Sequence, residues 1–177
     1  MLPLNNESTI IEPYSLHVIH GKFQKIFLKM SKVYRDSLYC SDFLDVQQAI
    51  LEHYRQALGY MNKSIMEIYT QHPLTQIHSC NLAHMIGLTP QYSSKIPLHL
   101  PPQISIHSIQ QQIHQLNIEI DQLAFMVRDY PNLETRVHVL FFAKAMTELF
   151  EIQQFYIYPF YPNLIPLYLR KGIYNKI

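Results

Sequence analysis

The clearest structural signal in this chain lies between Ser105 and Tyr130, which reads SIHSIQQQIHQLNIEIDQLAFMVRDY. Apolar side chains recur there every three or four residues, at Ile106, Ile109, Ile113, Leu116, Ile120, Leu123, Val127 and Tyr130. This spacing places them on one side of an α-helix, as the a and d positions of successive heptads. The residues between them are largely glutamine and acidic residues, so the opposite face is polar. We expect a long helix that packs one face into a core.

Three further segments repeat this helical spacing, at about 15–40, 42–71 and 132–156. Ser41 or Asp42 is the expected N-cap of the second segment, and Leu44 begins its apolar stripe. The last segment is apolar on two sides, which is typical of a helix that is central or shared with a second surface. Short turns near residues 40 and 131 join the helices as antiparallel pairs. The sequence therefore predicts an all-α fold with four long helices in a bundle.

The connection over residues 73–104 differs in composition from the helices. Residues 74–86 fit a short extra helix that Gly87 ends. Beyond it, Pro90, Pro97 and the pair 101–102 interrupt any regular helix. We expect an ordered, proline-rich crossover laid over the bundle, because loose connections of this length are unusual in compact domains. The predicted organisation is an N-terminal extension (1–14), a single helical-bundle domain (15–156) and a tail (157–177).

The tail is rich in aromatic residues and proline. Proline at this spacing prevents a long helix, so we expect an extended or polyproline-like segment packed on the bundle. Aromatic side chains supply rigid contact area, and proline lowers the ordering cost of an extended peptide, so the tail either completes the core or binds a partner. The residues expected to contact a partner, on the tail and on the two-sided fourth helix, are Phe141, Phe142, Tyr158, Phe160, Tyr161, Leu164 and Tyr168.

Composition narrows the classes of function. The chain has 177 residues, the size of one domain, and a formal net charge of +1, which gives no electrostatic footprint for a nucleic acid. Charged residues make up 15%, against about 25% in typical domains. A surface poor in charge favours association with another protein or with further copies of the chain. Four glycines and no glycine-rich phosphate-loop motif argue against a nucleotide site.

Ten histidines raise the question of a metal. No Glu-x-x-His pair of the kind found in dimetal bundles occurs, and the heptad register places His53, His107 and His114 on outer faces. The densest cluster is His78, Cys80 and His84, in which the last two are four residues apart on one face of a helix. Cys80 and His84 supply half of a zinc site, and the other ligands would have to come from His99, His107 or a second chain. The alternative is a buried cysteine among surface histidines.

No catalytic residues are predicted. Family-type signatures flank neither Cys40 nor Cys80, and Glu134 with His138 has the i, i+4 spacing of a solvated helix pair. The N-terminus lacks the pattern of a signal peptide and no window has the length of an apolar membrane span, so a cytoplasmic protein with reduced thiols is expected.

The favoured interpretation is a non-enzymatic protein–protein interaction module without a cofactor, a subunit or adaptor of a larger assembly or homo-oligomer. Two alternatives remain open. One is a metal- or ligand-binding bundle that uses the His78, Cys80 and His84 cluster with zinc. The other is an effector-type protein exported without a cleaved signal peptide.

Overall fold

The computed structural model describes residues 16–71, 103–130 and 135–173, and this part of the chain is helical without a strand. The long helices are α1 (Leu16–Leu38), α2 (Gln47–Gln71), α4 (Ile106–Arg128) and α5 (Thr135–Glu151). The shorter elements are the 3₁₀ helices η1 (Ser41–Phe43) and η4 (Pro162–Leu164), the π-helix η3 (Ile152–Ile157) and α6 (Leu167–Ile173). The predicted all-α fold with four long helices is confirmed. The predicted extension and most of the predicted crossover lie outside the described residues.

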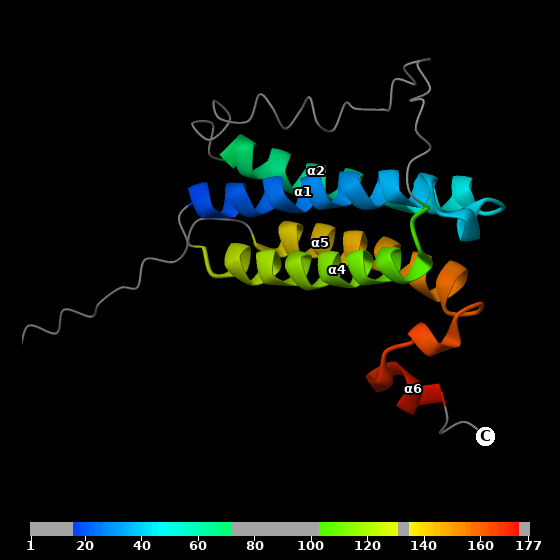
Figure 1. Cartoon of the computed structure of the whole chain (residues 1–177). Helices are drawn as coiled ribbons and strands as arrows, with labels where there is room; N and C mark the ends of the chain where they lie inside the picture. The colour runs from blue at the N-terminus through cyan, green and yellow to red at the C-terminus, as the bar shows by residue number, and fades with distance from the viewer. Residues whose placement is uncertain (1–15, 72–102, 131–134, 174–177) are drawn as a thin grey trace, which may run out of the picture.

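The four long helices lie side by side in two layers, α1 with α2 and α4 with α5 (Figure 1). Within each layer the two helices run in opposite directions. Across the layers, α1 packs against α4 and α2 packs against α5. The tail leaves one end of the bundle, so that α6 lies beyond the two layers in Figure 1. Each long helix therefore has two helical neighbours and one face turned outward.

The apolar stripe of α4 is the clearest link between sequence and fold. The Ser105 side chain caps the helix by accepting a hydrogen bond from the Ser108 backbone N–H at 3.3 Å. Seven of the eight stripe residues are buried, and Tyr130, the last, is half-buried. Within the described ranges no helix combines the length and apolarity needed to cross a membrane.

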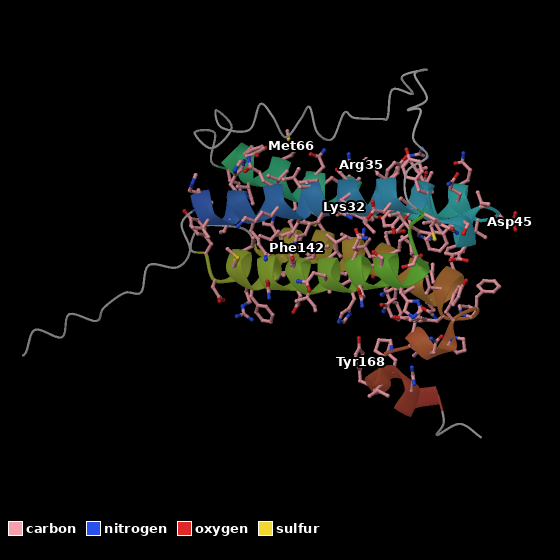
Figure 2. The ribbon with its side chains drawn as sticks, viewed as in Figure 1. Lys32, Arg35, Asp45, Met66, Phe142 and Tyr168 are labelled. Carbon is pink, nitrogen blue, oxygen red and sulfur yellow. The ribbon has the colours of Figure 1, made fainter. Side chains whose placement is uncertain are left out.

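Aromatic rings join the two layers. The rings of Phe23 in α1 and Phe142 in α5 lie 5.8 Å apart between centroids, and neither side chain is more than 1% exposed. Figure 2 shows Phe142 between the layers, whereas Tyr168 lies on the tail. Phe142, expected from the sequence to contact a partner, is thus part of the core.

Polar side chains inside the bundle are paired across helices. The Ser37 hydroxyl is hydrogen-bonded to the Val33 carbonyl oxygen at 2.8 Å and to the Tyr54 hydroxyl at 3.1 Å. Burial raises the pKa of Tyr54 far above its usual value, against the opposing effect of Ser37, so the phenol stays neutral. His138 is fully buried and is hydrogen-bonded through Nδ1 to the Ser64 hydroxyl at 2.8 Å. The prediction of a solvated His138 is therefore wrong, because α5 turns this position toward α2.

The start of the second helix differs from the prediction. α2 begins at Gln47, after the 3₁₀ turn η1, and not at Ser41 or Asp42. Phe43 is fully buried by this turn, and Leu44, predicted to begin the apolar stripe, is 69% exposed. A 3₁₀ helix has about 3.0 residues per turn, against 3.6 in an α-helix, so a stripe assigned with the α-helical period places Leu44 on the wrong side.

The tail is helical in two short pieces and not extended as predicted. Pro162 lies in the first turn of η4, and Pro166 directly precedes α6 and accepts hydrogen bonds from the backbone N–H groups of Leu169 and Arg170. Proline is tolerated at these positions, because the first residues of a helix have no intrahelical partner for their N–H groups. The Arg170 guanidinium also donates to the Ile165 carbonyl oxygen at 2.7 Å, which fixes the turn before α6.

Candidate functional site

The junction between α5 and η3 positions the candidate site. A π-helix makes i→i+5 hydrogen bonds, and here the Tyr158 N–H donates to the Gln153 carbonyl oxygen at 2.8 Å. Ile152 and Ile157, at the two ends of η3, are fully buried in the bundle. Gln153 is held between them and is only 3% exposed. Such single-turn π-helices occur frequently at functional sites.

A cleft of about 430 Å³ opens beside η3. Its walls come from four elements, with Asn117 and Ile118 from α4, Phe150 from α5, Gln153 from η3 and Tyr168 from α6. Ile118 and Phe150 are each more than one third exposed, so the floor and sides of the cleft present apolar surface to solvent. The arrangement is a concave, mainly apolar surface with a small number of polar groups, which is typical of binding sites.

Two amide side chains in the cleft each have a buried atom without a hydrogen-bond partner in the described part of the chain. These atoms are Nε2 of Gln153, a donor, and Oδ1 of Asn117, an acceptor. A buried polar atom left without a partner costs about 1–3 kcal/mol. A ligand that offers both an acceptor and a donor, as a peptide group does, is chemically complementary to this pair.

The ionisable groups of the cleft leave it without a strong charge. Apart from tyrosines, the ionisable side chains that line it are His114 and Asp121, both exposed on α4. Burial raises the pKa of Tyr158 above its usual value, against the lowering effect of the nearby Gln110 amide. The Tyr158 phenol is therefore neutral at physiological pH. These features suit an uncharged ligand segment better than a phosphate or a polyanion.

Exposed aromatic rings lie on the tail. Phe160 and Tyr168 are 71% and 68% exposed, and Tyr168 also lines the cleft. The Asp42 carboxylate raises the pKa of the Tyr161 phenol, because a negative charge beside the hydroxyl disfavours its ionisation. Rigid aromatic side chains next to a concave surface are the residues that contribute most to binding energy in protein interfaces.

A second cluster lies between α2 and α5. Nδ1 of His53 lies 2.8 Å from Oε2 of Glu148 and 3.5 Å from Oε2 of Glu151. All three residues are partly buried, and their candidate ligand atoms lie within 4.8 Å of one another. The Tyr156 ring covers the imidazole, with 5.8 Å between the ring centroids. The prediction that His53 faces outward is wrong, because α5 packs on that flank of α2.

Comparison with family models, with curated proteins and with solved structures gives no match.

The residues predicted to bind a partner are distributed over three environments. Phe142 belongs to the core, and Tyr158 is 9% exposed at the wall of the cleft. Phe160 and Tyr168 are exposed. The half-buried residues are Phe141, Tyr161 and Leu164. The predicted zinc ligands His78, Cys80 and His84 lie outside the described residues.

Sequence reasoning missed the polar residues of both sites. Asn117 and Gln153 carry no motif, and an amide without a partner becomes visible only when its surroundings are known. The Cys40 side chain is 1% exposed, and burial raises the pKa of its thiol, which suits a packing role.

Proposed function

We propose that this chain is a protein–protein interaction module, a subunit or adaptor, whose cleft beside η3 binds an extended peptide segment of a partner protein. The observation that carries the proposal is the unpaired donor and acceptor of Gln153 and Asn117 in an apolar cleft. A main-chain peptide group of the partner accepts from Gln153 and donates to Asn117. Ile118 and Phe150 contact an apolar side chain of the same segment.

The exposed aromatic residues support this assignment. Tyr168 lines the cleft and is 68% exposed, so its ring can contact a bound segment, and Phe160 is a second exposed ring on the tail. The low charge of the chain supports it too, because exposed surface poor in charge favours association. We further propose that the protein acts in the cytoplasm, where a surface of this kind meets folded partners.

The Gln153→Leu variant tests the proposal, because it should weaken peptide binding without lowering the stability of the fold. The variant removes the unpaired donor and keeps a side chain of similar size. We expect unchanged or higher stability, by up to about 1 kcal/mol in urea unfolding, because a buried unsatisfied group has been removed. We expect about tenfold weaker binding of a peptide selected on the wild-type chain from a random displayed library, measured by fluorescence anisotropy.

The matched control is Gln154→Leu, which makes the same chemical change at the exposed neighbouring residue. This control should leave both affinity and stability unchanged, and Tyr168→Ala should weaken binding without unfolding the bundle. Point variants are preferable to truncation after Gln154, which removes the core residues Ile157 and Tyr158. A library that yields no binder, or a binder insensitive to both Gln153→Leu and Tyr168→Ala, contradicts the proposal.

Sedimentation of the same variants tests whether a second copy of the chain occupies the cleft. If Gln153→Leu dissociates an oligomer, the occupant is a second copy.

A further inference from the structure

The cluster formed by His53, Glu148 and Glu151 contains two carboxylates and only one basic side chain. Both carboxylates lie within ion-pair distance of the same imidazole nitrogen. Among the described residues, no lysine or arginine forms an ion pair with either of them. Lys144, one turn before Glu148, places its ammonium group 5.4 Å from the centre of the Tyr60 ring. Two partly buried carboxylates thus share one histidine, which can supply at most one positive charge.

We propose that His53, Glu148 and Glu151 form a binding site for a divalent transition-metal cation such as Zn²⁺. The geometry fits, because two ligands bonded to a tetrahedral zinc at about 2.1 Å lie about 3.4 Å apart. The distance of 3.5 Å between His53 Nδ1 and Glu151 Oε2 matches this value. The distance of 2.8 Å between Nδ1 and Glu148 Oε2 is that of a hydrogen bond, and it lengthens when both atoms bind the same metal ion.

The ligand set selects the type of cation. One imidazole nitrogen and two carboxylate oxygens suit zinc and its first-row neighbours, whereas magnesium prefers oxygen ligands alone. Three protein ligands leave coordination positions open to water or to a group from a partner. The helices hold the ligands in place, because the side chains next to the two glutamates, Leu149 and Ile152, are fully buried.

Zinc binding at this site is measured directly by calorimetry. A carboxylate only accepts hydrogen bonds, so the His53 nitrogen that faces Glu148 carries a proton. Zinc binds a neutral imidazole, so on a neutral ring this proton moves to Nε2 when the metal takes its place on Nδ1. Calorimetric titration of the full, tag-free chain with ZnCl₂ should give about one zinc bound at this site, and its affinity is the quantity that the variants change.

Three single variants test the ligands. Glu151→Gln keeps the side-chain shape and the bond between His53 and Glu148, so it leaves the fold intact and is expected to weaken zinc binding more than about tenfold. His53→Gln should weaken zinc binding by a similar factor, because it removes the nitrogen ligand. His107→Gln alters an exposed histidine of α4 and should leave this affinity unchanged. Circular dichroism of each variant separates loss of ligand from loss of fold.

The outcomes are mutually exclusive. Zinc affinity that falls in Glu151→Gln and His53→Gln but not in His107→Gln supports the site. A chain that binds no zinc, or zinc that resists both changes, overturns it. Zinc that is released by Cys80→Ser and not by Glu151→Gln also overturns it, and assigns the metal to the His78, Cys80 and His84 cluster instead.

Discussion

Replacing Phe142 by alanine is expected to lower the free energy of unfolding by about 3–5 kcal/mol. The Phe142 ring is almost fully enclosed and packs against the Phe23 ring of the opposite layer and near the His138 ring of its own helix. Its removal leaves a cavity at the contact between the two layers, which the surrounding helices can fill only partly. Urea unfolding monitored by circular dichroism measures the loss, and the melting temperature should fall by on the order of 10 °C.

The matched control is Phe160→Ala. The same atoms are removed, but from a side chain that is 71% exposed, so stability should change by less than about 0.5 kcal/mol. Equal losses in the two variants would contradict the assignment of Phe142 to the core. The sequence left two roles open for the aromatic residues, packing in the core or binding a partner. The same pair of variants distinguishes these roles, because Phe160→Ala should affect partner binding alone.

Replacing Lys29 by methionine is expected to destabilise the bundle by about 1–3 kcal/mol at pH 7. The Lys29 ammonium of α1 forms an ion pair with the Glu119 carboxylate of α4, whose side chain is 7% exposed. Burial raises the pKa of Glu119, but hydrogen bonds from Lys29 and Gln115 outweigh it, so the pKa lies below its usual value. Without Lys29, a buried carboxylate loses its cation. Because the Lys29 side chain is about half exposed, the loss of unfolding free energy stays below the value for a fully buried ion pair.

The pH dependence of this variant provides a second test. Because the folded pKa of Glu119 is depressed, its contribution to stability is present above the unfolded value of about 4.3 and is lost as the pH falls through the folded pKa. The difference in stability between the wild-type chain and Lys29→Met should therefore narrow as the pH is lowered from 7 to below about 4. Arg55→Met, which breaks the exposed pair with Glu52, should cost less than about 1 kcal/mol at either pH. If the stability difference between the wild-type chain and Lys29→Met stays constant with pH, the lost stability comes from packing of the aliphatic part of Lys29 and not from the ion pair.

The sequence predicted the bundle because burial on one face leaves a regular pattern in a regular helix. The stripe from Ile106 to Val127 is buried throughout, as its period indicates. The same reasoning failed where the helical period changes. The 3₁₀ turn η1 places Leu44 at the surface, and two of the tail prolines, Pro162 and Pro166, stand at positions where short helices begin and do not break a helix.

Neither candidate site could be predicted from residue spacing, because each is assembled from residues that are far apart in the chain. His53 and Glu148 are separated by 95 positions. The heptad register describes one contact surface, whereas α2 packs against both α1 and α5, so its buried face is wider than the register implies.

Gln153 and Asn117 are ordinary polar residues in the sequence. They become functional candidates only because η3 and α4 leave one amide atom of each buried without a partner.

The π turn of η3 also determines how the chain tolerates a change of length at this point. In an α-helix each residue turns the chain by about 100° and advances it by about 1.5 Å. A π turn, with i→i+5 hydrogen bonds, takes up more residues for each revolution. Deleting one residue from 152–157, so that the π turn closes as an α turn, therefore leaves the direction of the tail around the axis of α5 nearly unchanged. Over evolutionary time, an insertion or deletion in this short stretch can change the residues beside the cleft without redirecting the tail.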